Sequence, residues 1–218
     1  GSIMSMLGTG TIGSLSNCFV IPSPIDSYGG IFETDQQVAQ IEKRRGGVGL
    51  NLNSLRPENT PVLNAAKTST GAHSFMDRYS NTTREVAQNG RRGALMLLMS
   101  VAHPDIFKFV RKKKDRSKVT GANISVQLTD EFMRAVESDS TFTCRFPVDT
   151  KSTAKLPTNA FNTLYAGFDP GTYFMLIKAK ELYQEIVENA WDNAEPGIAF
   201  MDNVVNYSPE GVYPQYRP

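Results

Sequence analysis

Residues 94–101 read Ala-Leu-Met-Leu-Leu-Met-Ser-Val and belong to the longest apolar run of the chain. A run of this length is far too short for a membrane span and is typical of a strand covered on both faces of a sheet. Pro104 follows at a position suited to the first turn of a helix. The apolar side of that helix comes from Ile106, Phe107 and Val110. The segment therefore predicts a buried strand followed by a helix.

Similar strand and helix patterns alternate along the rest of the chain. Short strands separated by helices imply right-handed crossovers and parallel pairing. We therefore predict an α/β fold with five mainly parallel strands and crossover helices, in a single domain covering residues 1–218. The other strands are predicted at residues 19–21, 48–53, 123–128 and 197–201, and further helices at 35–45, 74–88, 130–136 and 173–193.

Local signals set the limits of these elements. Thr34 is a suitable N-cap for the helix at 35–45, with Val38 and Ile41 facing inward, and Thr129 is a suitable N-cap for the helix at 130–136. Residues 138–170 are rich in Ser, Thr and Pro without periodicity, so we predict an irregular insertion. Residues 207–218 are predicted to be a terminal loop.

Composition narrows the class of protein. The 218 residues include 23 Lys and Arg against 22 Asp and Glu, so the net charge of +1 gives no reason to expect a nucleic-acid or membrane partner. Two cysteines and two histidines are too few for a disulfide scaffold or a Cys/His zinc site. The first 20 residues lack the pattern of a secretory signal. We expect a soluble, cytoplasmic, globular protein without a metal site.

The two cysteines and two histidines differ in whether the sequence suggests a functional role for them. Cys18 follows a segment rich in Gly and Ser and stands where a strand begins, so its thiol could approach a ligand closely. Taken alone, the residue favours a buried cysteine that packs as a small apolar side chain. Cys144 has no general base nearby in sequence, and His73 and His103 show no ligand spacing, so all three are predicted to be structural.

Two glycine-rich turns and one basic run could contact a nucleotide. Residues 46–49, Gly-Gly-Val-Gly, join a helix to a strand, where missing side chains admit a ligand, although tight packing explains the glycines equally well. Residues 89–93 place two arginines between glycines, which favours a phosphate contact. Residues 111–118 carry a dense run of Lys and Arg, which is usually a solvated loop; binding of an anionic ligand is the functional alternative.

An ordered set of short motifs spans nearly the whole chain. They are residues 14–21 (Ser-Leu-Ser-Asn-Cys-Phe-Val-Ile), 43–51 (Lys-Arg-Arg-Gly-Gly-Val-Gly-Leu-Asn), 55–57 (Leu-Arg-Pro), 90–96 (Gly-Arg-Arg-Gly-Ala-Leu-Met), 103–106 (His-Pro-Asp-Ile), 123–126 (Asn-Ile-Ser-Val), 129–133 (Thr-Asp-Glu-Phe-Met) and 195–200 (Glu-Pro-Gly-Ile-Ala-Phe). In this order they resemble one family, the large, catalytic subunit of ribonucleotide reductase. No single motif would suffice, but the ordered set is specific.

The resemblance implies a function that composition does not reveal: radical-based reduction of ribonucleotides to deoxyribonucleotides for DNA synthesis. By the family pattern, Cys18 aligns with one of the two cysteines that reduce the substrate and become a disulfide. Ser16, Asn17, Gly46 and Gly47 match positions that line the nucleotide substrate. The implied fold is a ten-stranded α/β barrel made of two halves, and the five predicted strands match the first half.

The resemblance also implies an effector site, where a deoxynucleoside triphosphate or ATP selects the base to be reduced. Asp26, Ser27, Lys43 and Arg56 match positions of that site. Lys43 and Arg56 would pair with phosphates, and Asp26 with a ribose hydroxyl.

Two further segments resemble the effector loops of the family. Residues 90–93, with Arg91 and Arg92, resemble the first loop. Residues 113–123, with Lys118, resemble the second, which relays effector identity to the substrate site.

Parts of the family pattern are absent from these 218 residues. The Asn-x-Cys-x-Glu motif, which supplies the thiyl-radical cysteine and an acid/base glutamate, does not occur. The second cysteine of the redox pair, the C-terminal cysteines and tyrosines and the N-terminal regulatory domain are also absent. We therefore expect a shortened chain or one piece of a split enzyme, inactive alone. It should associate with the C-terminal half of the catalytic subunit, and its exposed apolar face favours a homo-oligomer or another partner.

No cofactor is expected to bind the chain directly. The radical would come from a metal-containing small subunit, which is favoured and usually goes with diphosphate substrates, or from cobalamin; thioredoxin or glutaredoxin would be the reductant. A non-catalytic nucleotide-binding or interaction module derived from the same barrel is the alternative function. A third reading, an unrelated reductase with Cys18 and Cys144 as its pair, requires their Cα atoms to lie within about 7 Å.

Overall fold

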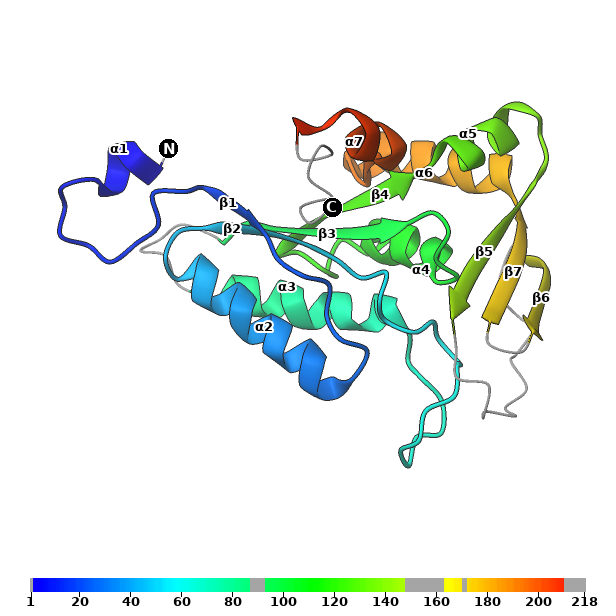
Figure 1. The fold of residues 1–218 in the computed structure, drawn as a ribbon, viewed down its shortest axis with the longest axis horizontal. Helices are drawn as coiled ribbons and strands as arrows, with labels where there is room; N and C mark the ends of the chain where they lie inside the picture. The colour runs from blue at the N-terminus through cyan, green and yellow to red at the C-terminus, as the bar shows by residue number, and fades with distance from the viewer. Residues whose placement is uncertain (1, 87–92, 148–162, 170–171, 210–218) are drawn as a thin grey trace. The chain divides into compact units, whose positions relative to one another are not determined.

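Five strands form one sheet in the computed structural model, which describes residues 2–86, 93–147, 163–169 and 172–209 (Figure 1). The strand order is β1-β2-β3-β4-β8, and β1 pairs with β2, β2 with β3, and β4 with β8 in parallel. The prediction of five mainly parallel strands with crossover helices is confirmed. The strands are β1 (Cys18–Val20), β2 (Gly47–Asn51), β3 (Leu95–Ser100), β4 (Ala122–Leu128) and β8 (Gly197–Phe200).

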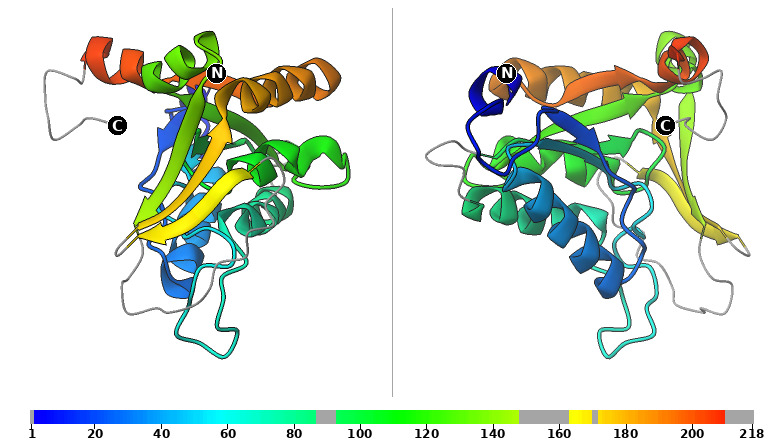
Figure 2. Two further views of the ribbon diagram at one scale, coloured as in Figure 1. Left: turned by 90° about the vertical axis from the view of Figure 1, so that its right-hand side faces the viewer. Right: turned by 60° about the vertical axis from the view of Figure 1, so that its left-hand side comes forward.

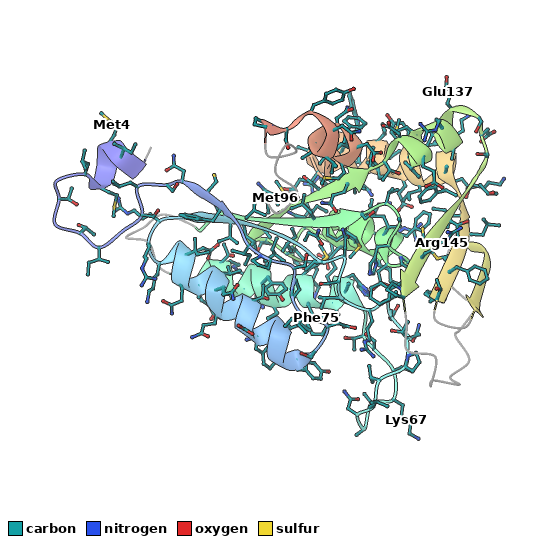
Figure 3. All side chains as sticks on the ribbon, viewed as in Figure 1. Met4, Lys67, Phe75, Met96, Glu137 and Arg145 are labelled. Carbon is teal, nitrogen blue, oxygen red and sulfur yellow. The ribbon has the colours of Figure 1, made fainter. Side chains whose placement is uncertain are left out.

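The chain divides into two compact units. The first comprises residues 1–98 and 111–124, and the second comprises residues 99–110 and 125–218. Helices of the first unit are α1 (Ser2–Met6), α2 (Tyr28–Glu42) and α3 (Met76–Glu85), with short 3₁₀ helices η1 (Ala72–Phe75) and η2 (Lys112–Lys114). Figures 1 and 2 show α2 and α3 lying side by side. The β2-to-η1 connection is a long excursion, with Lys67 near its tip (Figure 3).

Helix α2 begins earlier than the sequence predicts. Its N-cap is Ser27, whose hydroxyl accepts a hydrogen bond from the backbone N–H of Gly30 at 3.0 Å, so the expected start after Thr34 is wrong. Thr34 is instead buried inside the helix, while Val38 is fully buried as predicted and Ile41 only partly so. The competing cap was missed because two helix-weakening glycines follow it.

The second unit contains a small antiparallel sheet that the sequence did not predict. Its strands β5 (Thr141–Pro147), β7 (Thr172–Lys178) and β6 (Thr163–Asp169) lie side by side in that order (Figure 2). The expected irregular insertion at 138–170 is therefore wrong at β5 and β6; residues 148–162 and 170–171 lie outside the described residues. The remaining helices of this unit are α4 (Ile106–Arg111, whose last residue belongs to the first unit), α5 (Asp130–Glu137), α6 (Ala179–Asn193) and α7 (Met201–Tyr207).

Strand β7 also corrects the helix predicted at 173–193. Tyr173, Met175 and Ile177 are buried while the residues between them are half-exposed, an alternation with the period of a strand. Helix α6 accordingly begins at Ala179. By contrast, Thr129 caps α5 as predicted, because its hydroxyl accepts a hydrogen bond from the Phe132 N–H at 3.2 Å. The predicted terminal loop at 207–218 falls mostly on residues 210–218, outside the described part.

Candidate functional site

The structure brings Asn17, Cys18, Gly46 and Gly47 together at the start of two paired strands. Cys18 opens β1, is exposed, and lies opposite Gly47 in the parallel register of β1 and β2. The Gly47 N–H donates a hydrogen bond of 2.6 Å to the Asn17 carbonyl. Ser16 precedes this contact and is exposed. The residues that the family resemblance assigns to the substrate therefore lie in one local cluster.

The two glycines of this cluster lack a side chain for different physical reasons. A Cβ on Gly46 would lie 2.5 Å from a methyl of Ile41 and 2.7 Å from the ring of Phe19, so packing between α2 and β1 requires this glycine. A Cβ on Gly47 would lie 3.3 Å from the Asn17 carbonyl oxygen. Gly47 is half-exposed, and the same Cβ would lie 3.4 Å from the Cβ of Ala94, so this glycine lets the strand backbone approach its neighbours closely beside Cys18.

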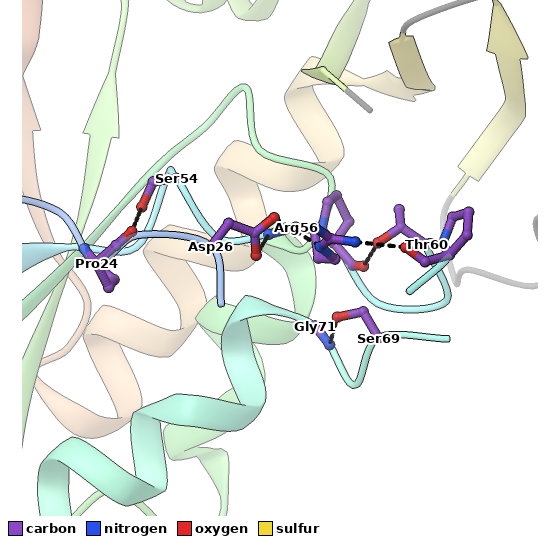
Figure 4. Close-up of polar contacts among 9 residues, drawn as sticks. Pro24, Asp26, Ser54, Arg56, Thr60, Ser69 and Gly71 are labelled. Carbon is purple, nitrogen blue, oxygen red and sulfur yellow. Dashed lines mark hydrogen bonds and ion pairs between the residues drawn. The ribbon is translucent and has the colours of Figure 1, made fainter. Parts of the chain in front are cut away.

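Asp26 and Arg56 form a second cluster (Figure 4). The Asp26 carboxylate accepts hydrogen bonds from Arg56 Nε at 2.8 Å and from the Arg56 backbone N–H at 3.2 Å. Arg56 Nη1 donates to the Pro61 carbonyl at 2.7 Å. This arginine thus fixes the base of the excursion that follows β2, and its side chain remains 34% exposed for a ligand.

The predicted effector residues do not all meet in one copy of the chain. Ser27 caps the N-terminal end of α2 next to Asp26, whereas Lys43 caps its C-terminal end. A helix of 15 residues separates them, which corresponds to roughly 22 Å at 1.5 Å per residue. Lys43 is exposed and lies close in sequence to the Gly46–Gly47 turn instead.

The segment that contains the basic run is attached to α3 both within the run and three residues after it. Lys112 forms an ion pair of 2.8 Å with Asp77, and the Gly121 N–H donates to the Ser80 hydroxyl at 2.8 Å. Lys118 lies between these anchors and is exposed. Its backbone N–H donates to the Asp115 carbonyl, which closes a turn. Arg91 and Arg92, from the other predicted effector loop, lie outside the described residues.

Cys144 and His103 are structural in the second unit, as the sequence predicts. The Cys144 thiol is fully buried and donates to the Val101 carbonyl at 3.4 Å, and burial raises the pKa of this thiol to about 12. His103 is buried, accepts a hydrogen bond at Nδ1 from the Asp105 N–H and packs edge-on against Phe146. A buried thiol is inaccessible to a substrate, so the exposed Cys18 is the reactive candidate.

Sequence reasoning missed a buried polar network between α2 and α3. Asp35 accepts hydrogen bonds from Arg78 at 2.7 Å and from the Thr82 hydroxyl at 2.5 Å. About two turns further along α2, Glu42 is fully buried and accepts a hydrogen bond of 3.0 Å from the Thr83 hydroxyl. The helical spacing of positions 31, 35, 38 and 42, which share one face of the helix, could have predicted that Asp35 and Glu42 lie on the buried side.

Comparison with known proteins identifies the family. The model of the ribonucleotide reductase barrel domain matches residues 16–211. The chain belongs to the ribonucleotide reductase family. Its five-stranded parallel sheet with helices corresponds to half of that barrel, as the sequence motifs implied.

Several large ribonucleotide reductases are similar to the chain. It is 34% identical over 208 residues to a vitamin B12-dependent ribonucleoside-diphosphate reductase of Thermoplasma acidophilum, and 32% identical to one of Mycobacterium tuberculosis; each alignment covers 94% of this chain. It is 30% identical over 86% of its length to the ribonucleoside-diphosphate reductase large subunit of Caenorhabditis elegans. The chain spans 24–26% of the length of these three relatives.

No helix in the described part combines the length and apolar character that crossing a membrane requires. No group of three or more His, Cys, Asp or Glu side chains there is arranged to hold a metal ion.

Proposed function

We propose that this chain forms part of the catalytic barrel of a ribonucleotide reductase that acts on ribonucleoside diphosphates. The observation that carries the proposal is an exposed thiol, Cys18, at the first position of β1 and opposite the half-exposed Gly47 of β2. The nucleotide substrate would lie against the Gly46–Gly47 turn with its ribose toward this thiol. The names of the similar proteins support a diphosphate substrate.

The chemistry requires two thiols for each turnover. Reduction of a ribonucleotide converts two thiols to one disulfide and releases the 2′-hydroxyl as water, with both electrons supplied by the sulfur atoms. Cys18 supplies one thiol. Cys144 does not supply the other, because its fully buried sulfur has a pKa of about 12. The second thiol and the radical-forming cysteine come from polypeptide outside these 218 residues in this proposal.

The Asp26–Arg56 cluster is the proposed place for the effector. An arginine that is one-third exposed offers N–H donors to a phosphate, and a neighbouring carboxylate can accept a ribose hydroxyl. Ser27 adds the N-terminal end of a long helix, where backbone N–H groups favour anions. We include Lys43 in this site only through a second copy of the chain, because α2 holds it away from Arg56.

Partners and radical source complete the proposal. A complementary barrel half would cover the exposed faces of the edge strands, where Val20 is 88% and Phe200 45% exposed. Thioredoxin or glutaredoxin would reduce the disulfide, and a small subunit or cobalamin would supply the radical. No step on this chain is assigned to cobalamin.

Nucleotide binding tests the effector site in the chain itself. Titration with dTTP, dGTP and ATP by calorimetry should give binding that Arg56→Ala weakens at least tenfold, while Arg134→Ala, an exposed arginine on α5, should leave it unchanged. Because Arg56 also holds Pro61, Arg56→Lys and a circular dichroism spectrum control for local unfolding. Equal affinity in the Arg56 and Arg134 variants would refute this site.

Reductase activity separates the catalytic function from the alternative of a nucleotide-binding module. The chain should be combined with the complementary part of the barrel, a dithiol reductant and either radical source, and CDP reduction measured. Activity that Cys18→Ser abolishes and Cys144→Ser retains supports the catalytic function. Nucleotide binding without any CDP reduction in this mixture would instead favour the non-catalytic module, and equal CDP reduction in the Cys18 variant and the unaltered chain would refute the role of Cys18.

A further inference from the structure

A buried carboxyl group lies at the end of α2 that leads into the Gly46–Gly47 turn, and it has no part in either proposed site. Glu42 is the last residue of α2 and is fully buried. Its Oε1 accepts a hydrogen bond from Thr83 of α3, and its Oε2 faces the backbone just before β3. A Cβ on Gly93 would lie 2.9 Å from this oxygen and 2.8 Å from the Thr83 methyl group, so Gly93 is held against both side chains.

A short series of contacts joins Glu42 to Cys18. Ala94 follows Gly93, and its carbonyl accepts a hydrogen bond of 2.8 Å from the Val48 N–H. Gly47, the residue before Val48, donates to the Asn17 carbonyl next to Cys18. Displacement of the backbone at Gly93 would therefore move the Gly46–Gly47 turn through hydrogen bonds that are already formed.

The surroundings of Glu42 favour its neutral form. Burial is the largest cause that raises the pKa of Glu42, to about 7; Asp35 acts in the same direction and the Thr83 hydrogen bond opposes both. Residues 93–98 carry no charged side chain, while residues 87–92, with Arg91 and Arg92, lie outside the described part. The titratable and charged groups on the two helices near it are Asp35 and Lys43 on and next to α2, and Arg78, Tyr79 and Arg84 on α3.

We propose that Glu42 is a proton-sensitive positioning residue: its protonated form holds the start of β3 at Gly93 and thereby the Gly46–Gly47 turn beside Cys18, and its ionisation loosens that hold. An ionised carboxylate in a buried site draws water or rearranges its surroundings, because charge is stabilised poorly there. The same carboxyl as an acid keeps its packing and can itself donate a hydrogen bond. The turn is therefore held more firmly below neutral pH than above it.

Hydrogen exchange detected by mass spectrometry tests this directly on the full chain without nucleotide. Protection of residues 44–50 and 93–98, corrected for the intrinsic pH dependence of exchange, should fall about tenfold between pH 6 and pH 8 if local opening exposes Glu42. Glu42→Gln should remove that fall. Glu33→Gln, an exposed glutamate on the same helix, should keep it.

A second variant guards against a simple loss of folding. Thr83→Val removes the hydrogen bond that favours the ionised form, so the midpoint of the fall should move to higher pH. An identical fall in Glu42→Gln and the unaltered chain, or an unmoved midpoint in Thr83→Val, would overturn the inference. Because no nucleotide is present, either result leaves the nucleotide titration to decide the proposed function on its own.

Discussion

Replacement of Glu42 by glutamine should change how the stability of this protein depends on pH. Glutamine keeps the shape of the side chain and an oxygen that can accept the Thr83 hydrogen bond, but it cannot ionise. Burial of the carboxyl raises its pKa from 4.5 to about 7, helped by Asp35 and opposed by Thr83. The folded state therefore holds a proton that the unfolded state releases near pH 4.5.

The sign and the size follow from linkage. Below about pH 4.5 both states are protonated, and the contribution of Glu42 to stability is fully present. Between about 4.5 and 7 only the unfolded state ionises, so stability falls as pH rises. Above the folded pKa the loss is complete, at roughly 3 kcal/mol from 1.36 kcal/mol for each unit of pKa difference. Between pH 5 and pH 8 the expected loss is about 2.5 kcal/mol.

Urea unfolding at pH 5 and pH 8 measures this loss. The free energy of unfolding should fall by about 2.5 kcal/mol more in the unaltered chain than in Glu42→Gln. Glu33→Gln, the exposed control on α2, should behave like the unaltered chain. Equal pH dependence in the unaltered chain and Glu42→Gln would refute the reasoning, because every other titrating group is common to both.

Two further predictions concern single residues. Iodoacetamide at pH 8 should alkylate the exposed Cys18 of the native chain and spare the buried Cys144, whereas both should react in urea. Peptide mass spectrometry measures the labelling of each cysteine. Labelling of Cys144 in the native chain would contradict its burial. Gly121→Ala should lower the free energy of unfolding by about 2–3 kcal/mol, because the new Cβ would collide with the Ser80 carbonyl oxygen. Gly29→Ala is the matched control, because its Cβ would meet only a hydroxyl 3.8 Å away. This variant should leave the free energy of unfolding unchanged or raise it by up to about 1 kcal/mol. Equal losses in the two variants would show that the contact with Ser80 is not the cause.

The sequence sufficed for the parallel sheet because its strands are short apolar runs between helices. Residues 94–101 predicted β3 closely, since a short apolar run interrupted only by Ser100 is typical of a strand inside a sheet. Prediction from the sequence failed for β7, because its aromatic and aliphatic residues also fit a helix that continues into α6. Only the pairing with β5 and β6, which is a tertiary contact, selects the strand there.

The candidate site was predictable in its parts and not in its arrangement. Motif resemblance named Asn17, Cys18 and Gly47, and the parallel register places them together. The same resemblance grouped Ser27 with Lys43, which the length of α2 keeps apart within one chain. A motif shows which residues are present, whereas the distance between them depends on where the helix begins, and the predicted start after Thr34 was wrong.

Helix α2 is the element that joins the two proposed sites. Its first turn lies beside Asp26 and Arg56, and its last residues lead into Gly46 and Gly47 next to Cys18. Asp35 and Glu42 tie the helix to α3 by hydrogen bonds in a buried setting, where breaking them costs more than at a surface. A ligand at the Arg56 end that favoured one position of α2 would therefore act on the Cys18 end through the whole helix rather than through a flexible loop. The ionisation of Glu42 would weaken the α3 attachment at the Cys18 end alone, so pH should alter that end while the Asp26–Arg56 contacts persist.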